Sequence, residues 1–173
     1  MIADRLGLMR PILEQPQYNM LNRDKVELDY PSLCRDFGLG LATWSPLLSG
    51  VLTGKYLRGI ADGTRLSISS HVIVNRIRHT LLSTPEGQVT HDKVRRIVSI
   101  AEQLGCTPAQ LAIAWCLRNR NVSSVITGAT RPQQIEENVA ALTIASRMNG
   151  EWDAVLEDVL GNKPETPFNY RDA

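Results

Sequence analysis

The sequence has few of the features that mark disulfide-rich, membrane-spanning or disordered proteins. Its 173 residues include only 5% aromatic residues and 3 cysteines, Cys34, Cys106 and Cys116, none of them in a CxxC spacing. An odd number of cysteines without paired spacing favours a reducing compartment over a disulfide framework. No stretch approaches the ~20 consecutive apolar residues that cross a bilayer, so we expect no membrane span.

An excess of charge of one sign is also missing. The chain carries 19 Lys and Arg against 18 Asp and Glu, a formal net charge of +1, so we expect no nucleic-acid partner. Asp4 and Arg5 interrupt what would be the apolar core of a signal peptide, and we therefore expect a cytoplasmic protein. His71, His79 and His91 lack HExxH spacing and have no cysteine nearby, so we predict no metal site.

What the chain does have is apolar material, 43% of its residues, in a length that suits one ordinary domain. Short apolar runs alternate with helical patterns, which is typical of a parallel α/β sheet covered on both faces. The predicted strands are 11–16, 41–44 and 123–126. The predicted helices are 1–8, 24–37, 72–82, 89–104, 108–117, 132–142 and 152–160, with a glycine-punctuated loop at 50–63 and an interruption at 84–87.

Ligands of parallel sheets bind beyond the carboxyl ends of the strands, which selects the segments 15–19, 44–47 and 128–131. The third leads through a glycine into a helix, with Thr130 near the cap and Arg131 beside it, an arrangement that favours anions. A capped surface helix is the competing interpretation, and a buried Trp44 followed by a turn competes at the second segment. The helix places Ile135, Val139 and Leu142 on one face and Gln134, Glu137 and Asn138 on another. A phosphate-loop interpretation of GVLTGKY fails, because the spacing before Lys55 is one residue short and Tyr56 replaces Ser or Thr.

At these strand ends the chain resembles the aldo-keto reductases, a family of NADPH-dependent (β/α)8 barrels. It is most similar to the branch that contains the voltage-gated potassium channel β subunits. The motifs that carry the resemblance are EQPQYN (14–19), TWSPLLSGVLTGKY (43–56), LGCTPAQLAIAWCLRNRNVSSVITGA (104–129), RPQQIEENVAAL (131–142) and LGNKP (160–164), followed by Tyr170-Arg171. The implied fold is α/β: strands six to eight and the flanking helices of a TIM barrel, an incomplete barrel in which 1–173 is the C-terminal half of the oxidoreductase domain.

The resemblance also implies an NADP(H) site. The residues implied for the nicotinamide and pyrophosphate are Gln15, Trp44, Ser45, Pro46, Leu47, Ser49 and Gly50. Those implied for the phosphates and the adenosine are Lys55, Arg65, Gly128, Thr130, Gln134, Glu137 and Asn138. Two departures stand out. Gly63 replaces a tyrosine that relatives often carry two residues before the arginine, so stacking on the adenosine is expected to be weaker, and Ser49 replaces a cysteine.

The family's catalytic Asp, Tyr, Lys and His lie in the N-terminal half of the barrel, so we assign no catalytic residue to this chain. Three functions stay open. In the first, the full-length protein would reduce aldehydes or ketones with NADPH. In the second, it would be a cytoplasmic β subunit, a homotetramer docked on a potassium channel α subunit and so held at the membrane. In the third, the chain would be a truncated, non-catalytic fragment. We expect poor solubility or molten behaviour of the chain alone, because strand faces around Ile12, Leu41 and Val125 would lack partners.

Overall fold

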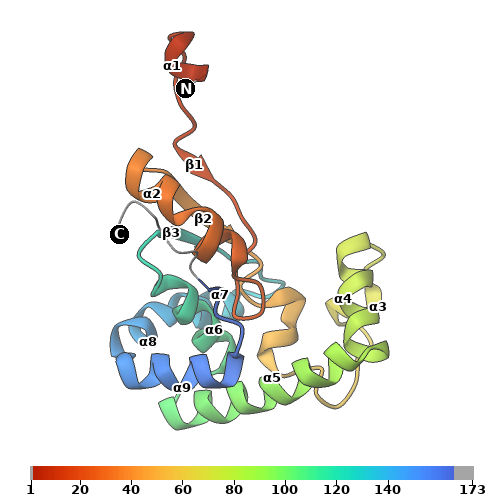
Figure 1. The fold of residues 1–173 in the computed structure, drawn as a ribbon. Helices are drawn as coiled ribbons and strands as arrows, with labels where there is room; N and C mark the ends of the chain where they lie inside the picture. The colour runs from red at the N-terminus through yellow and green to blue at the C-terminus, as the bar shows by residue number, and fades with distance from the viewer. Residues whose placement is uncertain (1, 166–173) are drawn as a thin grey trace.

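Three parallel strands form the only sheet in the part of the chain that the computed structural model describes, residues 2–165 (Figure 1). They are β1 (Leu13–Glu14), β2 (Gly40–Trp44) and β3 (Val122–Ile126), in the order β1-β2-β3. Leu13 pairs with Gly40 in one ladder, and Trp44 pairs with Ile126 in the other. The predicted α/β class and all three strands are thereby confirmed, although β1 is shorter than expected.

Helices make up most of the described chain. The short helical elements are α1 (Ile2–Arg5), the π-helix η1 (Lys25–Asp29), α2 (Pro31–Phe37), the 3-10 segment η2 (Leu48–Thr53) and α3 (Arg65–Ile68). The longer helices are α4 (Val72–Ser83), α5 (Pro85–Leu104), α6 (Pro108–Leu117), α7 (Pro132–Val139), α8 (Ala141–Arg147) and α9 (Gly150–Leu160).

Several helix boundaries differ from the prediction; α1, for example, ends at Arg5 and not at Leu8. The helix expected over 24–37 is two elements, because Pro31 has no N–H to continue the ladder and instead begins α2. The helix expected over 132–142 divides at Ala140; α8 buries Ala141 and Ile144, whereas α7 buries no side chain. The expected interruption at 84–87 is a helix start, since the Thr84 hydroxyl accepts the Gly87 N–H and caps α5.

Helix α6 lies at the centre of the core. Its first turn is closed by a capping box, in which the Thr107 hydroxyl accepts the Gln110 N–H and the Gln110 side chain accepts the Thr107 N–H. Every residue from Leu111 to Cys116 is buried, and α6 contacts α8, β3, η2 and α5. The sandwiched position that its apolar sequence predicts is therefore confirmed, as is the packing role of Cys116.

The outer strands are more exposed than their apolar sequences predict. Both residues of β1 are exposed, and Ile12 and Ile126 keep 81% and 41% of their surface. Within the described residues no strand pairs with the outer edge of β1 or of β3, so both edges lack a ladder partner. The expectation was wrong at Leu41, which is fully buried in the middle strand, and Val125 is half-buried. The apolar face of Ile135, Val139 and Leu142 is 58–60% exposed.

Helices α3 and α4 form an arm beside η2, joined to the first turn of α5 (Figure 1). The joint is tight at Gly87, where a Cβ would lie 2.3 Å from the Thr80 carbonyl oxygen and 2.6 Å from that of Leu81. Backbone therefore meets backbone there, and only a glycine fits. Tyr170 and Arg171, which the resemblance includes, lie outside the described residues.

Candidate functional site

The carboxyl ends of the three strands meet at one edge of the sheet, as predicted. The Trp44 N–H donates to the Pro16 carbonyl over 3.0 Å, and the Tyr18 N–H donates to the Trp44 carbonyl over 3.1 Å, so the segment after β1 runs beside the end of β2. Because Trp44 pairs with Ile126, Gly128 follows close to the same edge. Gln15 is exposed and Trp44 is half-buried there.

The loop after β2 has an unusual backbone. Ser45, Leu48 and Ser49 have φ values of 61°, 45° and 55°, in the left-handed region that residues with a side chain rarely adopt. Gly50 continues the series with a φ of 94°. Conformations of this kind cost of order 1–3 kcal/mol each and cluster at ligand sites, where the surrounding structure holds them. The sequence motif gave no sign of this geometry.

Side chains hold three carbonyl groups of this loop. The Asn19 side-chain amide donates to the Ser45 carbonyl over 3.0 Å, and the Tyr56 hydroxyl donates to that of Ser49 over 3.2 Å. The Thr53 hydroxyl donates to the Gly50 carbonyl over 2.8 Å. Asn19 is fully buried, and its side-chain oxygen accepts the Leu21 N–H, so its orientation is fixed. These supporting residues were not identified from the sequence.

Lys55 folds back onto this loop. A Cβ on Gly50 would lie 2.5 Å from Cε and 2.7 Å from Nζ of Lys55, and Nζ lies 5.1 Å from the Tyr56 ring centroid. Arg65 begins α3 and is exposed; the next residue, Leu66, donates its N–H to the Tyr56 hydroxyl over 3.4 Å. Lys55 thus lies at the Ser49-Gly50 turn, and the start of α3 is hydrogen-bonded to Tyr56, whose hydroxyl also contacts that turn.

The turn between β3 and α7 is organised by Gln134. Its side-chain oxygen accepts the Thr130 N–H over 2.7 Å, the Thr130 hydroxyl over 3.2 Å and the Arg131 N–H over 3.2 Å. Arg131, not Thr130, is the residue that precedes the helix. An anion at this turn would compete with the Gln134 oxygen for these three donors. The capped-helix and anion-site interpretations therefore concern the same hydrogen-bond donors. Gly128 is open, with nothing within 4 Å of an added Cβ.

Of the two residues predicted to bind the adenine, Glu137 is exposed and Asn138 is half-buried, both on α7. The Glu137 carbonyl accepts a hydrogen bond from the Gln110 side chain over 3.2 Å, which links α7 to the core helix α6. The end of α7 is therefore held to the core while its side chains stay accessible. Pro46 and Gly50 are buried, and Leu47 and Ser49 are half-buried.

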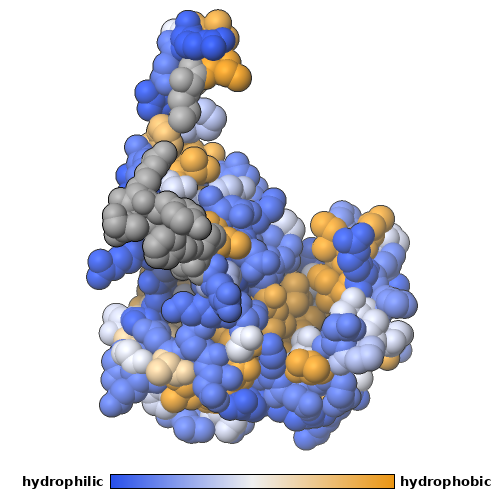
Figure 2. Space-filling model, in the orientation of Figure 1, coloured by the Kyte–Doolittle hydropathy of each residue, from blue (hydrophilic) through white to orange (hydrophobic). Residues whose placement is uncertain are grey.

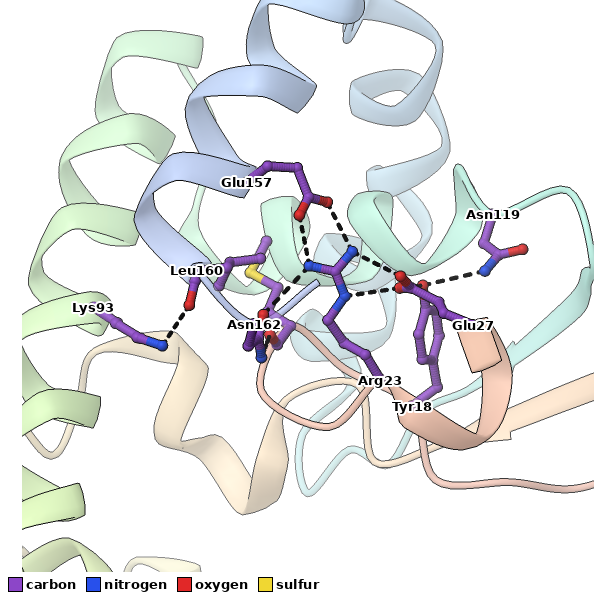
Figure 3. A network of polar contacts seen from close by, with 9 residues as sticks. Tyr18, Arg23, Glu27, Lys93, Asn119, Glu157, Leu160 and Asn162 are labelled. Carbon is purple, nitrogen blue, oxygen red and sulfur yellow. Dashed lines mark hydrogen bonds and ion pairs between the residues drawn. The ribbon is translucent and has the colours of Figure 1, made fainter. Parts of the chain in front are cut away.

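Tyr18, although it falls in the segment predicted to face a ligand, points into the core. Its side chain is only 2% exposed and its ring centroid lies 5.0 Å from that of Trp115. Its hydroxyl donates to Glu27 over 2.6 Å and accepts from Asn119 over 3.2 Å (Figure 3). Burial raises the pKa of the phenol above its usual value, and the hydrogen bond to Glu27 adds to the rise. Tyr18 is therefore a packing residue.

The same network centres on Arg23, whose side chain is 3% exposed (Figure 3). Its guanidinium binds both carboxylate oxygens of Glu27, at 2.9 and 2.7 Å, and both of Glu157, at 2.8 Å. It also lies 5.1 Å from the centre of the Trp115 ring. Burial disfavours the charged form, but the hydrogen bonds to Glu157 and Glu27 outweigh it and raise the pKa of Arg23. The segment after β1 is thereby fixed to α6 and α9.

The described residues hold no group of three or more His, Cys, Asp or Glu side chains placed to bind a metal ion. His71 caps α4 by accepting the Ile73 N–H, and Nε2 of His91 is buried without a hydrogen-bond partner in residues 2–165. None of the helices described is both long and apolar enough to cross a bilayer.

Comparison with known proteins places these features in a family. The sequence profile of the aldo/keto reductase family matches residues 1–157. A Schizosaccharomyces pombe protein provisionally named voltage-gated potassium channel subunit beta is 44% identical over 163 residues, which are 94% of this chain and 46% of that protein.

Two plant proteins with the same provisional name are similarly close. The Arabidopsis thaliana protein is 46% identical over 170 residues, 98% of this chain and 50% of the relative. The protein from Oryza sativa subsp. japonica is 45% identical over 171 residues, again 98% and 50%. The chain therefore spans about half the length of the curated relatives it matches.

Proposed function

Because the chain belongs to the aldo/keto reductase family, we propose that residues 1–173 are the NADP(H)-binding C-terminal half of such a domain, with β1, β2 and β3 as strands six to eight of its (β/α)8 barrel. The observation that carries the proposal is the left-handed loop at 45–50, held by Asn19, Thr53 and Tyr56 at the carboxyl edge of the sheet. This edge is where barrel enzymes bind their ligands.

The residues present fit a dinucleotide. Trp44 offers a half-buried aromatic surface, and Gln15 offers an exposed amide one residue before Pro16, whose carbonyl accepts the Trp44 N–H; the two suit the nicotinamide and its carboxamide. The backbone of 45–50 is already shaped, so a pyrophosphate can approach it closely, and Lys55 brings a positive charge to the same turn. Arg65 adds a second positive charge from α3.

The adenosine end would lie at the turn before α7. Thr130 and Gln134 would contact a 2′-phosphate next to the open Gly128, and Glu137 and Asn138 would hydrogen-bond the adenine. The bound cofactor would supply the hydride for reduction of an aldehyde or ketone. The chain's own residues bind and orient it, and the proton donor would come from the other half of the domain, since Tyr18 is buried and paired with Glu27.

A second function is favoured by the relatives' names. All three are provisionally named as channel β subunits, so the whole protein would dock, as a homotetramer, on a cytoplasmic surface of a potassium channel α subunit. Carbonyl reduction by a polypeptide that contains both halves of the domain would favour the enzyme. Copurification of that polypeptide with channel tetramers, without turnover, would favour the β subunit. A chain of this length that acts by itself would be non-catalytic under either function.

The cofactor site is tested by changing Thr130→Ala and Gln134→Ala together. We expect NADPH binding to weaken by about tenfold or more, and NADH binding much less, because only NADPH carries the 2′-phosphate that loses charge-assisted hydrogen bonds. The measurement is fluorescence titration of each nucleotide against the folded chain. The matched control changes Gln103→Ala and Thr143→Ala, an exposed pair elsewhere on the helices. Equal losses for the two nucleotides would refute the 2′-phosphate assignment.

A further inference from the structure

An apolar hollow lies between η2 and α4 and is also lined by Thr90 of α5 (Figure 2). Its walls are formed by Leu48 and Val51 of η2 and by Ile77 and Leu81 of α4. The cavity has a volume of about 180 Å³. At ~30 Å³ per liquid water this corresponds to roughly six water molecules, enough for a small organic molecule.

The polar residues that line the hollow are one arginine and two threonines, so none of them carries a negative charge. Arg76, which is exposed, lines the hollow together with the half-buried Thr80 and Thr90. Within residues 2–165 the Arg76 guanidinium makes no hydrogen bond or ion pair. The neighbouring Arg78, by contrast, donates to the Leu66 carbonyl over 2.9 Å and to the Asn75 side chain over 2.5 Å. No carboxylate lines the hollow.

We propose that this hollow binds a small carboxylic acid with an apolar body. The carboxylate pairs with Arg76, and the apolar body fills the space among Leu48, Val51 and Ile77. The planar guanidinium can take both carboxylate oxygens at once. The apolar part gains from burial at ~25 cal/mol per Å².

The hollow is connected to the cofactor loop through Leu48. This residue has a φ of 45° and stands between Leu47 and Ser49, two of the proposed pyrophosphate contacts. An acid packed against Leu48 would favour that backbone conformation and so strengthen NADPH binding, and NADPH would strengthen acid binding by the same factor. This coupling rests on the proposed function, whereas acid binding itself does not.

The test is a titration of hexanoate into the 173-residue chain, followed by the methyl resonances of Leu48, Val51 and Ile77. Hexan-1-ol and hexylamine serve as uncharged and cationic probes of the same length. Protection of the α5 amides from hydrogen exchange verifies that the helices around the hollow are folded. We expect hexanoate to shift these methyl groups at lower concentration than hexanol does, and hexylamine to bind worst.

Arg76→Gln should weaken hexanoate binding by up to about fivefold and abolish its advantage over hexanol, because an ion pair at an exposed arginine is lost. Arg120→Gln, the same change at an exposed arginine before β3, should leave binding unchanged. Thr80→Phe, which fills the hollow, should abolish binding of both probes. Absence of hexanoate shifts, or equal affinity for wild type and Arg76→Gln, would overturn the proposal. Hexanoate binding without any NADPH binding would instead overturn the cofactor assignment and leave the hollow standing.

Discussion

The two sides of the molecule are similarly apolar and differ sharply in burial. On the helical side, Ile97 of α5, Leu111 of α6 and Leu156 of α9 are fully buried. On the strand side, Ile12 beside β1 and Ile126 of β3 keep 81% and 41% of their surface. The difference lies in whether another layer of the described chain covers them. An apolar pattern in the sequence thus predicts which residues can be buried, but it does not predict which segment covers them.

This difference bears on the behaviour of the chain by itself. An exposed apolar face with unpaired strand edges favours association with other copies or with a covering segment. The relatives are about twice as long, and the family fold is a closed barrel in which strands have neighbours on both sides. Poor solubility of the isolated chain stays a prediction. A cooperative thermal transition in monodisperse protein would contradict it and would make the free energies of unfolding below measurable on the chain alone.

The largest effect is expected at Arg23, because it joins the strand side to the helical side. Arg23→Ala leaves Glu27 and Glu157 facing each other without a counterion, and we expect a loss of about 3–5 kcal/mol in the free energy of unfolding. Urea unfolding followed by far-ultraviolet circular dichroism measures it. Arg95→Ala is the control, since its pair with Asp92 is exposed and should contribute less than about 1 kcal/mol. Similar losses for both variants would show that the network does not join the two sides.

A matched pair of truncations tests the two sides directly. Leu156→Ala removes a fully buried side chain from α9 and should cost about 2–5 kcal/mol, because it leaves a cavity. Val139→Ala removes a side chain that is 60% exposed on α7 and should change stability by less than about 0.5 kcal/mol. Thermal unfolding of the two variants gives both values. A large loss at Val139 would mean that α7 is covered in solution by another copy of the chain.

The smallest effect concerns the rate of thiol labelling. Burial raises the pKa of the Cys34 and Cys106 thiols, so the reactive thiolate is a minority species at pH 8 and its fraction should rise about tenfold per pH unit below the pKa. Cys116 is fully buried and its pKa is also raised, so it should react only when the core opens. Mass spectrometry of labelled peptides between pH 7 and 9 follows all three. Labelling of Cys116 as fast as Cys34 would show that the core is molten.

Local signals in the sequence predicted most of the fold. Thr107-Pro108, Gly38 and Gly105 begin or end helices as their residue types indicate. The errors arose where distant packing decides the outcome. Leu41 is buried because it lies in the middle strand, and the face of Ile135 is exposed because no described segment covers it, and neither fact is visible in the local pattern.

The candidate site was located by the family motifs and by the rule for strand ends, but the way it is held was not foreseen. Asn19, Thr53 and Tyr56 are ordinary residues in the sequence until the backbone of 45–50 brings its carbonyls to them. Arg23 and Glu27 are four residues apart and could have been paired from the sequence. Glu157, which completes the network from α9, is 134 residues away from Arg23 and could not.

Because Gly87 has no Cβ, α4 and α5 can approach each other closely where the arm joins α5. Because the first turn of α5 touches the carbonyl groups of Thr80 and Leu81 without an intervening methyl group, any other residue at position 87 acts as a wedge between the two helices. The spacing between α4 and α5, and with it the shape of the hollow, therefore depends on a residue that does not line the hollow. A larger residue at position 87 would have to push α4 and α5 apart, and it would thereby change the shape of the hollow while every lining residue stayed the same.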